Sequence, residues 1–317
     1  MSILSRTNDR TEADVTTRFR ILLLGGCALL LLGAVAPAWW GAALFGGPAA
    51  AQQNPAGGGG PVRSITQIAG DVYRFQNGGH YSVFMVTPAG VIVTDPINAD
   101  AARWLKAEIA TRFNQPIKYL IYSHDHADHI EGGEVFADTA IVIAQEKAKV
   151  HIVGEKRRTA VPQVTFSDRM EIELGGKIVE LHYLGRNHGD NSVVMRFPAE
   201  RVLFAVDFVE FGRLPFRDLR NGYVDDWIES LRRVEAMDFD IFASGHTALA
   251  KKADVPAVRA YLEQLRSEVL KLVREGKSLD EIKATVKMEA YKSWTQYETF
   301  LPLNIEGMVQ YLNLYRR

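Results

Sequence analysis

Four residues that can bind metal ions fall within a stretch of six. Between Ser123 and Ile130 the chain reads Ser-His-Asp-His-Ala-Asp-His-Ile, and the candidate ligands are His124, His126, Asp128 and His129. Histidine and aspartate are costly to bury unless they are paired or bound to a metal. Imidazole and carboxylate suit Zn²⁺, and iron or manganese also accepts them. The density of ligands therefore predicts a metal site, and a solvated polar turn is the less favoured alternative.

These ligands follow a segment that reads as a buried strand, residues 117–122. Other candidates stand in the same position after later predicted strands, namely His188, Asp207 and His246. A site for two metal ions needs more ligands than one loop supplies. The three later residues would complete such a site if the strand ends meet.

The order and spacing of these residues resemble the metallo-β-lactamase superfamily. The resemblance covers residues 72–246. It implies an α/β fold, an αββα sandwich with metals at one edge between two β-sheets. One metal would be bound by His124, His126 and His188. The other would be bound by Asp128, His129 and His246, with Asp207 bridging both.

The resemblance also implies a reaction. Two Zn²⁺ ions per chain, with Fe or Mn as alternatives, would activate a shared hydroxide that attacks the substrate. Asp128 is the candidate catalytic residue, as a ligand that orients this hydroxide or accepts its proton. Asp95 matches the structural aspartate of the first motif. No side-chain nucleophile is needed, so the prediction is a metal-dependent hydrolase.

Three positions separate this chain from the β-lactamases of the superfamily. Asp207 stands where those enzymes carry a cysteine, His129 where they usually carry arginine, and Glu210 where they carry a carboxylate-binding lysine. Glutamate would repel a substrate carboxylate. The ligand set is similar to glyoxalase II-type thioesterases and lactonases, although 188–194 and 202–208 are similar to the β-lactamases. We expect hydrolysis of an ester, thioester, lactone or β-lactam; a dedicated β-lactamase and an iron-dependent, sulfur dioxygenase-like oxidoreductase are the alternatives.

Four residues are candidate contacts for a small-molecule substrate. His80 lies in the glycine-containing segment 77–81, where the family often carries a substrate loop, and the others are Asn191, Phe208 and Arg213. Arg213 is the candidate for binding an anionic group in place of the missing lysine. Structural roles are the alternatives to substrate contact: an ordinary glycine turn at 77–81, a turn position for Asn191 and packing for the aromatic side chain of Phe208.

Hydrophobic periodicity predicts paired strands with helices between them in a catalytic domain, residues 64–250. Strands are expected at 72–75, 81–86, 91–94, 117–122, 140–143, 171–174, 177–184, 192–197, 202–206 and 239–243. Helices are expected from Asn98 or Asp100 to Phe113 and from Val224 to Met237. This order indicates two mixed sheets packed face to face with helices outside.

Residues 251–317 have a helical pattern throughout. Asp254 is the predicted cap of a first helix, and Ser278 with Glu281 forms a predicted capping box for the next. We expect this C-terminal extension to pack on the core through its apolar stripe. A pocket lid or a dimer surface is the alternative.

The N-terminal residues have a different composition. Arg18 and Arg20 precede an apolar run, 21–40, and small residues end at Ala51, so 1–51 is predicted to be a signal peptide. The run is about 20 residues, long enough to span a bilayer, so an uncleaved membrane anchor is the alternative. Residues 52–63 are rich in glycine and are predicted to be a flexible linker. Either interpretation places the catalytic domain outside the cytoplasm, periplasmic or secreted.

The composition as a whole is that of an ordinary globular protein, with 47% hydrophobic and 24% charged residues in 317. The net charge of −1 and the lack of a basic run with interleaved aromatics argue against nucleic acid as a partner. The single cysteine, Cys27, excludes an intrachain disulfide.

Overall fold

The computed structural model describes residues 60–219 and 222–315. The predicted signal peptide or anchor, 1–51, and most of the predicted linker lie outside the described residues. No helix within the described ranges is long and apolar enough to cross a membrane.

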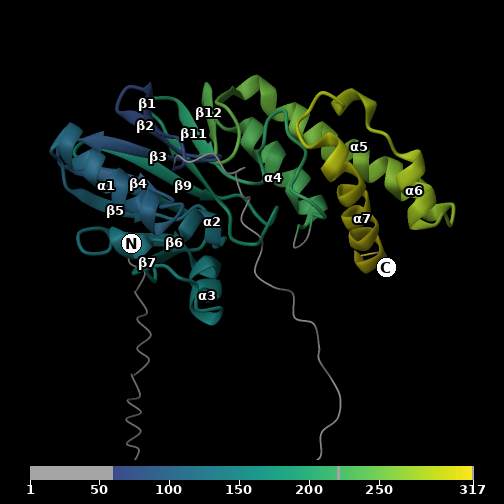
Figure 1. Ribbon diagram of the computed structural model, residues 1–317, viewed down its shortest axis with the longest axis horizontal. Coiled ribbons are helices and arrows are strands. Elements are labelled where there is room, and N and C mark those ends of the chain that lie inside the picture. The colour runs from purple at the N-terminus through teal and green to yellow at the C-terminus, as the bar shows by residue number, and fades with distance from the viewer. Residues whose placement is uncertain (1–59, 220–221, 316–317) are drawn as a thin grey trace, which may run out of the picture. The chain divides into compact units, whose positions relative to one another are not determined.

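Two β-sheets form the centre of the described part (Figure 1). The first sheet has seven strands in the order β1-β2-β3-β4-β5-β6-β7, antiparallel up to β4 and parallel from β4 onward. Its strands are β1 Arg63–Ala69, β2 Val72–Asn77, β3 His80–Thr87, β4 Gly90–Thr94, β5 Ile117–Ile121, β6 Ile141–Gln145 and β7 Val164–Phe166. The carboxyl ends of the parallel strands β4 to β7 lie at the same edge of this sheet, so the loops that follow them can bring functional side chains together.

The second sheet has six strands in the order β13-β12-β11-β10-β9-β8, and all pairs are antiparallel except β11 with β12. Its strands are β8 Arg169–Leu174, β9 Lys177–Tyr183, β10 Val193–Phe197, β11 Val202–Ala205, β12 Ile241–Ser244 and β13 Ala250–Lys251. The Gly175-Gly176 pair connects β8 and β9 with both φ angles positive, a turn that glycine adopts without strain.

Apolar side chains fill the space between the two sheets and cover their outer faces. Between the sheets, Ile92 belongs to the same core as Met195 and Phe204. On the outer face of the first sheet, Leu105 of helix α1 packs in a second core with Leu120. The layers are therefore helix, sheet, sheet and helix, and the predicted αββα fold is confirmed.

The helices of the second outer layer come mostly from the C-terminal part of the chain. The α-helices are α1 Ala99–Phe113, α2 Ala127–Ile130, α3 Glu146–Gly154, α4 Val224–Ala236, α5 Val255–Arg274, α6 Leu279–Thr285 and α7 Tyr297–Tyr315. Helices α5, α6 and α7 lie beyond α4, away from the first sheet (Figure 1). Trp227 of α4, Leu262 of α5 and Met308 of α7 share one core with Phe242 of the second sheet. The expected packing of the extension on the core is confirmed.

Helix capping follows the sequence in two places and departs from it in a third. Asn98 caps α1 by accepting hydrogen bonds from the first-turn backbone, and Ser278 forms the predicted capping box with Glu281. Asp254 stands before α5, but its carboxylate accepts a hydrogen bond from the Lys251 backbone 2.8 Å away. Asp254 therefore occupies the predicted N-cap position, with Pro256 in the first turn, but its side chain makes no capping hydrogen bond because the preceding turn uses that carboxylate.

Candidate metal centre

Loops at neighbouring strand ends bring the seven predicted ligands together. The motif that starts at His124 follows β5, and short helix α2 carries Asp128 and His129. In the second sheet, His188 lies in the β9–β10 connection, Asp207 follows β11, and His246 follows β12. These residues fall into overlapping groups whose ligand atoms lie within 4.8 Å of one another, and His80 at the start of β3 joins one group.

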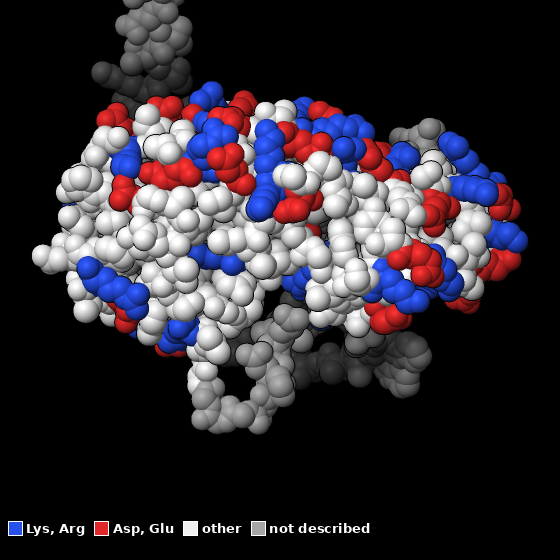
Figure 2. Space-filling view, turned by 90° about the horizontal axis from the view of Figure 1, so that it is seen from above, with Lys and Arg blue, Asp and Glu red and all other residues white. Residues whose placement is uncertain are grey.

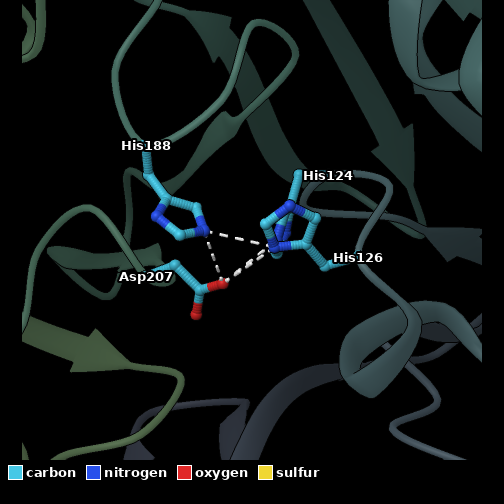
Figure 3. Close-up of side chains that lie close together, drawn as sticks. All are labelled: His124, His126, His188 and Asp207. Carbon is cyan, nitrogen blue, oxygen red and sulfur yellow. Dashed lines mark hydrogen bonds and ion pairs between the residues drawn. The ribbon is translucent and has the colours of Figure 1, made fainter. Parts of the chain in front are cut away.

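The first group surrounds one oxygen of Asp207 (Figure 3). Its Oδ2 lies 3.1 Å from His124 Nε2, 3.5 Å from His126 Nδ1 and 3.4 Å from His188 Nε2. The two last nitrogens are 3.2 Å apart. Ligands 2.0–2.1 Å from a tetrahedral zinc ion are separated by about 3.3 Å. The four distances above, 3.1–3.5 Å, are close to that separation.

The second group surrounds the other oxygen of the same carboxylate. Asp207 Oδ1 lies 3.1 Å from His129 Nε2 and 2.9 Å from His246 Nε2, which are 3.0 Å from each other. Asp128 Oδ2 is 3.7 Å from both nitrogens. It also lies 3.3 Å from His80 Nε2. The two oxygens of Asp207 therefore face two separate histidine groups, the arrangement of a bridging carboxylate.

The backbone at Asp207 is strained. Its φ is 60°, in the left-handed region, and Phe208 N donates to Val206 O at 2.6 Å across it. This is a γ-turn with a positive φ, which is rare for residues other than glycine. Such strain persists where the surrounding structure imposes it, and it clusters at functional sites.

Polar groups outside the ligand set lie beside the second ring nitrogen of two histidines. Fully buried Asp95 places Oδ2 3.3 Å from His129 Nδ1 and accepts the Ser123 backbone N–H on Oδ1 at 2.8 Å. Ser123 Oγ lies 3.0 Å from His124 Nδ1. Partners of this kind hold the second ring nitrogen, so that the first points at the metal.

Asn191 contacts the loop that carries the first ligand motif. It is 2% exposed, and its Nδ2 donates to Asp125 Oδ1 at 2.9 Å. Arg157 Nη2 donates to the other oxygen of Asp125 at 2.9 Å. Our sequence analysis assigned no role to Asp125 or Arg157. The position of Asp125 inside the ligand motif was an available signal, whereas nothing in the sequence marks Arg157.

The remaining substrate candidates differ in their surroundings. Phe208 is 1% exposed and belongs to the core beside α4. Arg213 Nη1 donates to Glu210 Oε1 at 3.3 Å, so its charge already has a partner. His80 lies at the metal centre, with its ring 4.7 Å from that of His246.

The electrostatics of the cluster place charge on the bridging carboxylate. Burial would raise the pKa of Asp207, but His129, His124 and His246 outweigh it and hold that pKa well below its usual value. Burial lowers the pKa of His124 to about 4, so this imidazole is neutral near pH 7. An ionised carboxylate and a neutral imidazole are the protonation states that bind metal.

The donor set fits a divalent metal ion. His124 Nε2 is buried and makes no hydrogen bond to any described residue. His129 and His246 direct ring nitrogens at each other over 3.0 Å. Buried nitrogens facing one another need a shared proton or cation. Imidazole and carboxylate ligands suit zinc, and iron or manganese also accepts them.

Comparison with known proteins agrees with this geometry. The profile of the metallo-beta-lactamase superfamily matches residues 77–246. The 2,4-dinitroanisole O-demethylase subunit alpha of Nocardioides sp. (strain JS1661) is 27% identical over 240 residues, which are 73% of this chain and 72% of that protein. The type 2 metallo-beta-lactamase of Elizabethkingia meningoseptica is 27% identical over 170 residues, 51% of this chain and 67% of that enzyme. A solved metallo-beta-lactamase from Pontibacter korlensis, 19% identical, has the same fold with a TM-score of 0.58 over 64% of this chain and 99% of its own.

Proposed function

Because the chain belongs to the metallo-beta-lactamase superfamily and is therefore a metal-dependent hydrolase, we propose that it holds two zinc ions and cleaves an ester, thioester, lactone or β-lactam bond. The observation that carries this proposal is the position of Asp207. Its two oxygens lie 2.9–3.5 Å from five histidine nitrogens that form two groups. A site for one metal ion would use only one of the two histidine groups and would leave the other without a bound ion.

The side chains have separate roles in this proposal. When bound, two zinc ions lower the pKa of a shared water and polarise the carbonyl to be attacked. Asp207 would bind both metal ions, one through each carboxylate oxygen, and so fix the two histidine groups relative to each other. Asp128 has a side chain that is 51% exposed, and its Oδ2 is the atom that would take up or orient a proton from the attacking water. His80 Nε2, 3.3 Å away, would hold that oxygen in place.

Several observations bear on the substrate. The face shown in Figure 2 mixes Lys and Arg with Asp and Glu and carries no large area of one sign, so this face offers no extended basic surface for nucleic acid. Glu210 is buried near His246 and Asp207, where it disfavours a carboxylate at that place. One relative is named for demethylation of 2,4-dinitroanisole at oxygen, and another for β-lactam hydrolysis. We therefore propose a general hydrolase, exported through residues 1–51.

The test combines metal analysis with a hydrolysis screen on the same sample. The full chain should contain two zinc ions and cleave at least one of a p-nitrophenyl ester, a thioester, a lactone and a chromogenic β-lactam. Asp207→Ala should lose metal and at least about 100-fold in kcat/KM, since even outer partners of a metal are worth 10–100-fold. Asp138→Asn, which alters an exposed ion pair with Lys106, is the matched control.

Three outcomes would contradict the proposal. Full activity in Asp207→Ala would remove the bridging role of that carboxylate. A zinc-loaded protein that cleaves none of the four substrates would argue against the reaction class. Iron in the native protein, with oxidation of a sulfur compound, would replace the hydrolase by the oxidoreductase alternative.

A further inference from the structure

A pocket of about 280 Å³ opens beside the metal centre. It lies between the β1–β2 hairpin and the loop that follows β12, and His246 forms part of its wall. Metal centre and pocket therefore share one side chain. No aspartate or glutamate lines the pocket, whereas Arg74 of β2 does.

Arg74 has no carboxylate partner among the described residues. Its Nη2 donates to the backbone oxygens of Ser244, at 3.0 Å, and Thr247. Its guanidinium carbon lies 3.6 Å above the ring of Tyr81. Its Nε is buried without a hydrogen-bond partner. Burial lowers the pKa of Arg74 to about 10, so the group stays charged near pH 7.

The other polar groups of the pocket offer hydrogen-bond donors. Tyr81 Oη accepts from Gln76 Nε2 at 3.3 Å, so its own proton is free to be donated. Thr247 Oγ1 accepts from the Phe211 backbone at 3.3 Å and keeps its proton as well. The Thr66 hydroxyl makes no hydrogen bond within the described part of the chain. A cation and three free hydroxyl protons around one small space are complementary to an anion.

We propose that this pocket binds an oxyanion group, a carboxylate, sulfate or phosphate, through Arg74 and the neighbouring hydroxyls. The volume suits one such group and not a whole drug-sized ligand. The group is either the anionic end of the substrate or a separate small anion. The substrate version rests on the proposed hydrolase function; anion binding itself does not.

The first experiment measures anion binding without catalysis. The melting temperature of the metal-loaded full chain is recorded with sodium sulfate, phosphate or acetate against sodium chloride at equal ionic strength. Sulfate and phosphate stabilise most proteins without binding a site, and anions can bind the metals, so the comparison is between variants. Wild type should gain a saturable increase of a few degrees that Arg74→Gln lacks.

The control is Arg196→Gln, because Arg196 is another half-buried arginine that donates to a backbone oxygen, that of Asp238 at 2.7 Å. It should keep the full anion response. Arg74→Lys keeps the charge and should keep part of it. Should Arg74→Gln fail to fold, Thr66→Val leaves the bonds of Arg74 to the β12 loop intact and should weaken the response severalfold.

The second experiment separates the two sources of the anion. If the anionic group belongs to the substrate, Arg74→Gln should raise the KM for anionic p-nitrophenyl hemisuccinate about tenfold. The KM for neutral p-nitrophenyl acetate should stay unchanged. If a separate anion occupies the pocket, Arg74→Gln should change the KM of both esters by the same factor. The anions should still raise the melting temperature of wild type. The proposal is overturned if wild type and Arg74→Gln respond equally to all three anions, because Arg74 then only anchors the loop. Absence of any ester hydrolysis would count against the proposed function alone.

Discussion

Asp95 lies outside the candidate ligand set and beside one of its histidines. It is fully buried, and its two oxygens divide between His129 Nδ1 and the Ser123 backbone. A negative charge on Oδ2 would make the facing imidazole a better metal ligand, because it favours the tautomer whose other nitrogen is free.

Asp95→Asn should therefore weaken binding of the metal held by His129 by about 10–100-fold while leaving the fold intact. The amide oxygen can still accept the Ser123 N–H, but the amide nitrogen offers a proton to His129. Competition with a chromogenic zinc chelator measures both affinities. The control is Asp138→Asn on the surface, and unchanged zinc affinity in Asp95→Asn would exclude this positioning role.

Glu210 makes stability depend on pH. Burial raises its pKa from 4.5 to about 7, although His246 and Arg213 oppose this. Between these two values the folded protein holds a proton that the unfolded chain has released. Stability therefore falls as pH rises through this window, and above about pH 7 the cost is constant.

Glu210→Gln should remove the loss of stability that occurs between about pH 4.5 and pH 7. Metal-free Glu210→Gln should match wild type near pH 4 and exceed it by about 1–3 kcal/mol at pH 8, since one pKa unit corresponds to 1.36 kcal/mol. Urea unfolding at both pH values measures the difference. Glu108→Gln in α1 is measured beside it as a control, and an equal gain of Glu210→Gln at pH 4 and pH 8 would contradict the titration of Glu210.

Helix α7 holds the segment that follows the bridging aspartate. Fully buried Asn304 donates to the backbone oxygen of Pro215, at 2.9 Å, and to that of Arg217, and it accepts from Tyr261 Oη at 2.7 Å. Three residues along the helix, a Cβ at Gly307 would lie 1.7 Å from Asp218 O. The C-terminal extension thus approaches this segment by direct backbone contact.

Gly307→Ala should destabilise the fold by about 1–3 kcal/mol, because the added methyl group overpacks the contact with rigid backbone. It should also lower activity, since the displaced segment leads back to Asp207. Gly154→Ala at the end of α3 is the control, because nothing lies within 4 Å of its Cβ. Thermal unfolding and ester hydrolysis are measured on both, and equal stability would show that α7 shifts without cost.

The elements that the sequence predicted are those with a strong local signal. Asn98, the Gly175-Gly176 turn and the Ser278 capping box each act within a few residues. Strands β1, β7 and β13 went unpredicted, and each is either exposed or very short: β1 contains no fully buried residue, β7 has three residues and β13 has two. Edge strands carry little of the alternating pattern that reveals a strand.

In the candidate metal centre as well, residues with a local sequence signal were predictable and long-range contacts were not. The ligands were predictable because four of them share one short motif and the others follow strands. The contacts that support them join distant positions, Asn191 to Asp125 across 66 residues and Arg74 to Ser244 across 170. Such pairs depend on how the two sheets meet, which local patterns do not encode.

In the described part of the chain, both sheets contribute residues to the candidate metal centre. The motif after β5 contributes ligands from the first sheet, and the loops after β9, β11 and β12 contribute those of the second. At the same edge the Tyr81 backbone donates to Gly245 O at 2.8 Å and the Val193 backbone to Ser123 O at 2.7 Å. Bound metal would add strong cross-links between sheets that are otherwise held by apolar packing and a few hydrogen bonds.

Removal of metal should therefore destabilise the entire fold and not only a loop. A ligand present at 1,000 times its Kd adds about 4 kcal/mol of stability, and 1 kcal/mol corresponds to about 2–4 °C in a domain of this size. Chelation should lower the melting temperature by about 10 °C, and zinc should restore it. Asp207→Ala should melt near the chelated value and respond to neither treatment. If chelation leaves the melting temperature of wild type unchanged, or removes only a minor early transition, the metals do not join the two sheets.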